Sequence, residues 1–141
     1  MEIKIKKLKD VELPKKHYEG DLGWDLFLPY DIEEIRLSPG QIAKIPIGIA
    51  TELPEGFGAV IRDRSSMASR GLHILGGEID NRYRGEWHLL MINLSPYEQV
   101  LRPGERIAQF RLTKVYEADI SETDSLSNTD RGAGGFESAG R

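Results

Sequence analysis

Glycines, one acid and one aromatic residue lie between two apolar runs in the stretch Leu75-Gly76-Gly77-Glu78-Ile79-Asp80-Asn81-Arg82-Tyr83-Arg84-Gly85-Glu86-Trp87. This pattern predicts a β-hairpin with a functional tip, because glycine allows positive φ and close approach of the backbone to a ligand. Asp80 and Tyr83 can place a carboxylate and an aromatic ring beside the same small planar ligand. The alternative is a purely structural turn, in which the glycines set the backbone and Asp80 caps it.

Short apolar runs alternate with turn signals on both sides of this hairpin. The turns are expected at Ser38-Pro39-Gly40, Leu53-Pro54-Glu55-Gly56 and Arg102-Pro103-Gly104. Turn signals separated by about 8–12 residues, with apolar alternation between them, are typical of an all-β sandwich or jelly roll. The nearly continuous apolar run Trp87–Leu94 predicts a strand buried on both faces.

Composition indicates one soluble domain. The chain has 141 residues, of which 39% are hydrophobic and 30% charged. It lacks both an apolar run of about 18 residues and the apolar block of a signal peptide, so a cytoplasmic location is expected, or a nuclear one in a eukaryote or a virus. The absence of cysteine excludes disulfides, thiolate metal sites and a cysteine nucleophile.

The charge is distributed unevenly along the chain. Residues 1–116 carry 17 acidic and 17 basic residues, whereas residues 117–141 carry six acidic and two basic ones. A neutral body without a basic stripe argues against stable nucleic-acid binding. We therefore expect a folded domain over residues 1–116 and a flexible C-terminal arm over residues 117–141, because the arm has few large apolar groups.

Three further segments contain candidate ligand contacts. Arg64, Ser65 and Ser66 open the one plausible helical turn, where an arginine, hydroxyls and free N–H groups can hold phosphate; an ordinary capped turn is the alternative. Asp25 lies opposite an apolar strand face, which commonly means solvated surface. Gln109 lies within an apolar-flanked strand and is either a structural amide or a ligand contact.

Near the end of the arm a single phenylalanine, Phe136, lies between glycines and a hydroxyl, with Arg131 upstream. This composition suggests a flap that orders over an anionic aromatic ligand, with glycine N–H groups and Arg131 at phosphate and Phe136 on a base. The alternative is a disordered tail with accidental bias.

Taken together and in this order, five segments resemble the motifs of the trimeric dUTPase family. They are Leu22–Leu26, Arg64–Ala68, Gly77–Gly85, Gly104–Gln109 and the terminal Gly/Phe segment. The resemblance covers about residues 20–141 and implies an all-β fold, a distorted jelly roll that forms a homotrimer with exchanged C-terminal arms. It also implies Mg²⁺-assisted hydrolysis of dUTP to dUMP and pyrophosphate, which limits uracil in DNA and supplies dUMP for thymidylate synthesis.

The resemblance assigns roles to individual residues. Asp80 would activate the attacking water as a general base, while Arg64 and Gln109 hold phosphate or the water. Asp25 would meet the metal through water, as expected for Mg²⁺. The remaining residues would bind substrate: Ser65, Ser66, Gly77, Ile79, Tyr83, Arg131, Gly134, Gly135, Phe136 and Ser138.

The sequence departs from the family pattern at four positions. Asp63 replaces the proline usual before the Arg-Ser pair, which should change loop stiffness more than chemistry. Glu78 replaces a small apolar residue beside the base-reading turn. Glu137 and Ala139 replace glycine and threonine in the arm, which removes one hydroxyl and adds negative charge near phosphate.

Two other functions fit parts of the same pattern. The related dCTP deaminase needs a catalytic glutamate five residues beyond the hairpin glycine, where this chain has Leu90. A non-catalytic or regulatory nucleotide-binding jelly roll would have no reason to keep Asp80, Arg64, Gln109 and Arg131 together.

Overall fold

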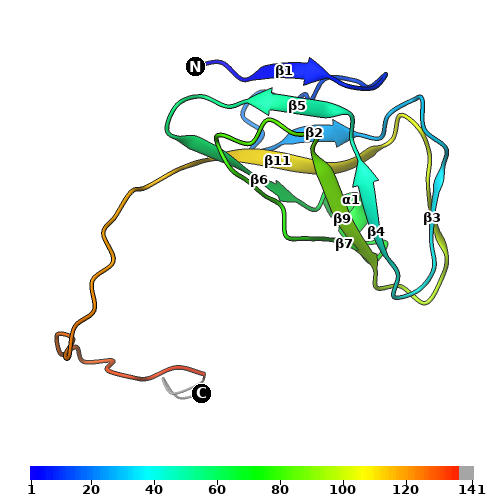
Figure 1. The fold of residues 1–141 in the computed structure, drawn as a ribbon. Coiled ribbons are helices and arrows are strands. Elements are labelled where there is room, and N and C mark those ends of the chain that lie inside the picture. The colour runs from blue at the N-terminus through cyan, green and yellow to red at the C-terminus, as the bar shows by residue number, and fades with distance from the viewer. Residues whose placement is uncertain (137–141) are drawn as a thin grey trace.

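The computed structural model describes residues 1–136, in which the regular structure is β-strand apart from one short helix (Figure 1). In chain order the elements are β1 (Lys4–Lys7), β2 (Trp24–Phe27), β3 (Ile35–Leu37), β4 (Ile42–Pro46), β5 (Ile49–Glu52), β6 (Phe57–Arg62), α1 (Ser65–Ala68), β7 (Leu72–Leu75), β8 (Glu78–Ile79), β9 (His88–Asn93), β10 (Gln99–Leu101) and β11 (Arg106–Lys114).

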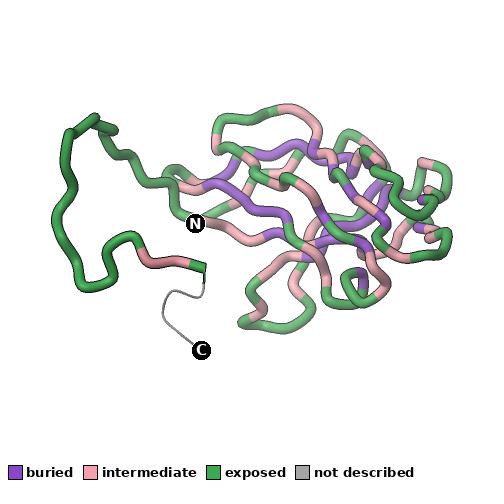
Figure 2. The backbone as a smooth tube through the Cα atoms, turned by 90° about the horizontal axis from the view of Figure 1, so that it is seen from below, coloured by how far each residue is buried: buried purple, intermediate pink, exposed green. Residues whose placement is uncertain are grey.

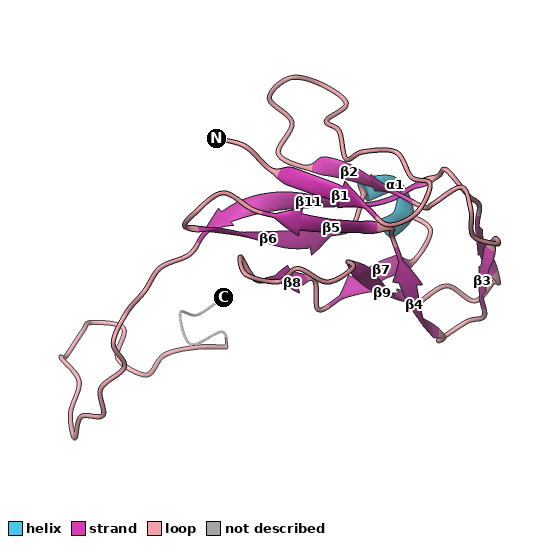
Figure 3. Ribbon diagram, turned by 45° about the horizontal axis from the view of Figure 1, so that its top comes forward, coloured by secondary structure: helices cyan, strands magenta, loops and turns pink. Residues whose placement is uncertain are grey.

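All strand pairs between these elements are antiparallel. The strands form a four-stranded sheet in the order β2-β11-β6-β8, a three-stranded sheet in the order β4-β9-β7, and the pair β1-β5 (Figure 3). β10 pairs with β3. Side chains of both larger sheets meet in one hydrophobic core, with Ile61 and Phe110 from the first and Leu89 and Met91 from the second. The all-β, jelly-roll-like prediction is confirmed.

The expected turns form as the sequence suggests. Glu105 N–H donates to Arg102 C=O at 3.1 Å, and between them Gly104 has a φ of 83°. Gly40 and Gly56 have φ values of 79° and 80° in the turns at Ser38 and Pro54. A positive-φ glycine shortly after a proline is the pattern of a type II turn, so these two residue types determine where the chain reverses.

The strand after the hairpin differs from expectation. The sequence pattern of Trp87–Leu94 predicts burial on both faces, but within β9 Leu89 and Met91 are buried whereas Leu90 is 41% exposed. The prediction is wrong because β9 belongs to a sheet that covers the core with one face only, so its apolar residues alternate between core and surface.

Beyond β11 the chain leaves the domain. Val115 N–H donates to Gly56 C=O at 2.8 Å, after which the described part of the arm is extended and mostly exposed (Figure 2). The arm positions Glu137, Ser138 and Ala139 lie outside the described residues. Within residues 1–136, no helix has the length and apolar character needed to cross a membrane.

One buried amide connects β9, the β9–β10 turn and β3. Asn93 is fully buried, and its Nδ2 donates to Leu37 C=O at 2.9 Å and to Tyr97 C=O at 2.7 Å. Its Oδ1 accepts from the N–H and the hydroxyl of Ser95 at 2.9 and 2.7 Å. Asn93 therefore fastens the β9–β10 turn to β3.

We expect Asn93→Leu to lower the free energy of unfolding by about 2–4 kcal/mol, because it removes the partner of two carbonyls and one N–H in a buried position. Urea denaturation at fixed protein concentration measures the change. Leu94→Ala is the control, since Leu94 is 65% exposed and its truncation should change stability little. Equal stability of Asn93→Leu and the unmodified protein would contradict the role of this amide.

Candidate active site

Gly77 lies at the start of the hairpin, where the backbone conformation and a close contact require glycine. Its φ is 90°, its carbonyl accepts the Ile61 N–H at 2.8 Å, and a Cβ at this position would lie 2.6 Å from the Ile61 carbonyl oxygen. Only glycine fits such a conformation and contact. Ile79 then pairs with Ala59 of β6, so the incoming limb of the hairpin is fixed to the four-stranded sheet.

Hydrogen bonds fix the hairpin tip as well. Tyr83 N–H donates to Asp80 C=O at 3.1 Å and closes the turn. Asn81 Nδ2 donates to the carbonyls of Pro54 and Phe57 at 2.9 and 2.7 Å, which holds the tip against the β5–β6 turn. The Tyr83 hydroxyl donates to Glu86 C=O at 2.8 Å, so the phenol ring is oriented before any ligand arrives.

A surface hollow lies beside this tip, and we call it the hairpin hollow. It is lined by Lys44, Glu78, Ile79, Asp80, Tyr83, Glu86, His88 and Leu90. Asp80 is exposed, and its carboxylate accepts no hydrogen bond from residues 1–136. A carboxylate with both oxygens available can bind and deprotonate a water molecule.

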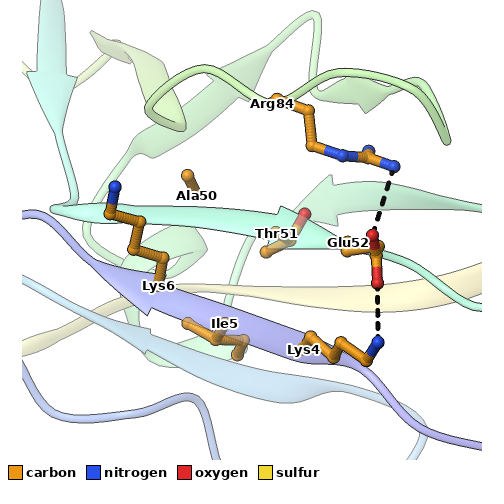
Figure 4. Close-up of a pocket in the computed structure, with 7 residues that line it drawn as sticks. All are labelled: Lys4, Ile5, Lys6, Ala50, Thr51, Glu52 and Arg84. Atoms are coloured by element: carbon orange, nitrogen blue, oxygen red, sulfur yellow. Dashed lines mark ion pairs between the residues drawn. The ribbon is translucent and has the colours of Figure 1, made fainter.

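Arg84, on the segment that follows the hairpin tip, contacts the β1–β5 pair (Figure 4). Glu52 lies between Lys4, at 3.0 Å, and Arg84, at 3.9 Å. The hydrogen bond and charge of Lys4 lower the pKa of Glu52, and those of Glu52 raise the pKa of Lys4. Because the Glu52 pKa is lower in the folded chain, this contact stabilises the fold above the carboxyl's unfolded pKa and is lost as the pH falls through the folded value.

A second hollow is built around an arginine and involves strands β2 and β11 of the four-stranded sheet. This arginine hollow is lined by His17, Tyr18, Asp21, Leu22, Gly23, Asp25, Arg64, Ser65 and Gln109. Asp25 is only 8% exposed, and its two oxygens lie 3.2 Å from Arg64 Nε and 3.4 Å from Arg106 Nε. The interpretation of Asp25 as solvated surface is therefore wrong: strand β2 places its carboxylate inside a charged cluster.

Arg64 is held in place by several partners. Its Nε donates to Asp25. Its Nη1 donates to Arg106 C=O at 3.1 Å and to the Ser66 hydroxyl at 3.3 Å. Nη2 has no hydrogen-bond partner within residues 1–136 and remains available to an anion. Arg64 is also the N-cap of α1, which has no side-chain cap, so neither Ser65 nor Ser66 caps this helix and both are exposed.

Gln109 lies next to this cluster in β11, paired with Asp25 of β2. Its Nε2 donates to Asp63 C=O at 2.8 Å. Its side chain passes over Gly23, where an added Cβ would clash with Gln109 Oε1. Sequence reasoning assigns no individual role to Gly23 or Arg106, although both lie inside quoted motifs, because their contacts depend on strand register.

The two hollows have no lining residue in common. Asp80, Tyr83 and Ile79 belong to the hairpin hollow, whereas Asp25, Arg64, Ser65 and Gln109 belong to the arginine hollow. Within one chain, these predicted site residues therefore form two groups that do not meet in a single site.

The described arm residues form a third, separate group. Arg131 Nε donates to the carbonyl of Gly134 at 2.8 Å, beside Gly135, and Phe136 is fully exposed. Ser138, the remaining predicted contact, lies outside the described residues.

Comparison with known proteins identifies a family to which this chain is similar. The dUTPase family profile matches residues 9–140. The chain is 43% identical to a deoxyuridine 5'-triphosphate nucleotidohydrolase of Hydrogenobaculum sp. (strain Y04AAS1), over 99% of both chains.

Two solved structures show the same fold. Staphylococcus bacteriophage 80alpha dUTPase with dUPNHPP matches with a TM-score of 0.90 and 24% identity over 99% of both chains. A mutant dUTPase from S. aureus phage phi11, described with a structural Mg(II) ion, matches with a TM-score of 0.81 and 18% identity over 91% of this chain and all of the phage chain. With the profile match over most of its length and a relative that is 43% identical, the chain belongs to the dUTPase family.

Proposed function

We propose that this protein hydrolyses dUTP to dUMP and pyrophosphate, with Asp80 as the general base. The observation that carries the proposal is the exposed Asp80 carboxylate, free of protein hydrogen bonds within the described chain, on a hairpin tip held by Asn81 and Tyr83. A base must be positioned firmly yet remain free to accept a proton, and Asp80 meets both conditions.

In the proposed reaction, Asp80 takes a proton from a water molecule that attacks the α-phosphorus. The bond from this phosphorus to the bridging oxygen breaks, and pyrophosphate leaves. Arg64 binds phosphate through Nη2, with Ser65 and the Ser66 amide beside it, and Gln109 orients the water or a phosphate oxygen. The fixed positions of Arg64 and Gln109 in the arginine hollow support these roles.

The hairpin is proposed to select the nucleoside. Backbone groups around Gly77 and Ile79 would read uracil, and the oriented Tyr83 ring would pack on deoxyribose where a 2′-hydroxyl does not fit. In the arm, Phe136 would cover the base, while Arg131 neutralises the γ-phosphate. Gly134, Gly135 and Ser138 would complete the closure around the triphosphate.

Mg²⁺ fits this site as an ion held mainly by the triphosphate. Residues 1–136 contain no cluster of three acids or histidines that could ligate a metal directly. Asp25 is a single carboxylate already paired with Arg64 and Arg106, which suits contact through metal-bound water. When bound, the ion would neutralise charge on the phosphates.

Assembly would complete the site. The hairpin hollow and the arginine hollow are separate in one chain, and the arm extends away from its own domain (Figure 1). Both observations support a homotrimer in which one chain supplies the hairpin, a second the arginine hollow, and an exchanged arm closes over them.

Leu90 argues against a dCTP deaminase. It lines the hairpin hollow with Asp80, at the position where the deaminase reaction needs a glutamate. Pyrophosphate release from dUTP, dCTP, dTTP and UTP in the presence of Mg²⁺ tests the proposed function directly. We expect turnover of dUTP; no turnover of any of the four would favour a non-catalytic nucleotide-binding protein.

We predict that Asp80→Asn lowers kcat by about 10³-fold, because the amide cannot accept the water proton. The dissociation constant for dUTP should change little, since base and phosphate contacts remain; calorimetric titration measures it. Glu55→Gln is the control, because Glu55 is an exposed acid in the β5–β6 turn and should leave kcat unchanged. Loss of dUTP binding by Asp80→Asn would contradict the assignment of Asp80 as base.

Deletion of residues 128–141 should leave the oligomer intact and lower kcat/KM for dUTP by about 10²-fold or more, because Arg131 and Phe136 would no longer close the site. Light scattering after gel filtration measures the assembly, and pyrophosphate release measures activity. A fully active truncated protein would show that the arm has no role in the reaction.

A further inference from the structure

Asp63 lies between β6 and α1, next to Arg64. The dUTPase resemblance alone predicts that this acid, which stands in place of a proline, changes mainly the stiffness of the loop. The structure assigns it a more specific role: we propose that Asp63 is a positioning residue that holds Arg64 and Gln109 in place by binding strand β7. This inference rests on the proposed function of those two residues.

The Asp63 side chain uses both carboxylate oxygens on β7. Oδ1 accepts the Ile74 N–H at 2.7 Å, and Oδ2 lies 2.6 Å from His73 Nδ1. Because β7 is an edge strand of its sheet, paired only with β9 among the described strands, its outward N–H groups need other partners. The carboxylate of Asp63 provides one, in a half-buried position with 24% of its side chain exposed. Hydrogen bonds to an ionised acceptor at such distances are among the stronger ones in proteins.

The Asp63 backbone leads directly to the proposed catalytic groups. Its carbonyl oxygen accepts a hydrogen bond from Gln109 Nε2, and the two atoms are 2.8 Å apart. The next residue, Arg64, forms the contacts with Asp25 and the Arg106 carbonyl. A shift of the Asp63 peptide would therefore move the Gln109 amide and the Arg64 side chain together.

Helix α1 offers little restraint of its own at this point. It has four residues, and its N-cap, Arg64, makes no side-chain capping hydrogen bond. A proline would restrict the loop through its fixed φ. In this chain the two contacts between Asp63 and β7 supply the restraint, and they connect the four-stranded sheet to the three-stranded sheet beside the arginine hollow.

The decisive comparison is between Asp63→Ala and Asp63→Asn in the full-length protein. Asp63→Ala loses both contacts, and we expect kcat for dUTP to fall by about 10- to 100-fold, because small displacements of positioned groups are costly to catalysis. Asp63→Asn keeps an oxygen that can accept the Ile74 N–H, and kcat should remain within about threefold of the unmodified protein. His73→Phe removes one contact only and should lower kcat by an intermediate factor.

Two further measurements separate positioning from general destabilisation. Inhibition by deoxyuridine, which has no phosphate, should have the same inhibition constant in all variants, because the hairpin hollow is unaffected. Exchange of the Gln109 side-chain amide protons, followed by NMR without substrate, should become faster in Asp63→Ala. Asp31→Ala is the control: Asp31 also accepts a backbone N–H, that of Asp10 at 3.1 Å, but it contacts none of the proposed site residues, so kcat should not change.

Unchanged kcat and unchanged amide exchange in Asp63→Ala would overturn the proposal. So would parallel losses of dUTP turnover and deoxyuridine binding, which would indicate general loosening of the fold. If the unmodified protein turned over no dUTP, the proposed function would fail, but the exchange measurement would still decide whether Asp63 positions Gln109.

Discussion

The register of β11 between β2 and β6 is the constraint on which the rest of the structure depends. Gln109 lies opposite Asp25 on one side and Arg62 on the other, and the next residue, Phe110, enters the core. A shift of one residue would exchange the two faces of β11, exposing Phe110 and burying Gln109. The same register therefore determines both the core packing and the geometry of the arginine hollow.

The core fixes this register through aromatic contacts. Phe110 stacks on Trp24 at a centroid distance of 5.3 Å and meets the edge of Trp87 at 5.1 Å. Trp87 follows the hairpin directly, so this cluster links the chain segment that carries Asp80 to the strand that carries Gln109. The proposed base and its partners are thus connected through packed aromatic rings, although they line different hollows. Such packing favours rigid positions of the residues in both hollows.

Sequence reasoning succeeded where local chemistry decides structure and was less successful where tertiary contacts do. Prolines and the glycines that follow them located the turns, because the required φ is a property of the residues themselves. The local pattern around Asp25 suggests solvated surface, which is wrong, since a strand pattern shows which face a side chain occupies but not that Arg64 and Arg106 converge on it from other segments. The predicted contact of Asp25 with the metal through water stays a prediction. β9 was misjudged because a run of apolar residues does not reveal whether a second layer covers the outer face. The separation of the two hollows has no sequence signal at all, because it depends on how the domain folds.

The arginine hollow also explains how a nearly buried acid and an arginine proposed to bind phosphate can coexist. An unpaired carboxylate at the exposure of Asp25 would be costly, so it requires cationic partners. Arg64 and Arg106 both provide this pairing. If Arg64 binds phosphate through Nη2 as proposed, Arg106 can continue to neutralise Asp25. Because Nε and Nη1 of Arg64 are already fixed by protein groups, little side-chain freedom remains to be lost on binding. The charge pairing that makes burial of Asp25 tolerable is therefore the same feature that would prepare Arg64 for the proposed anionic substrate.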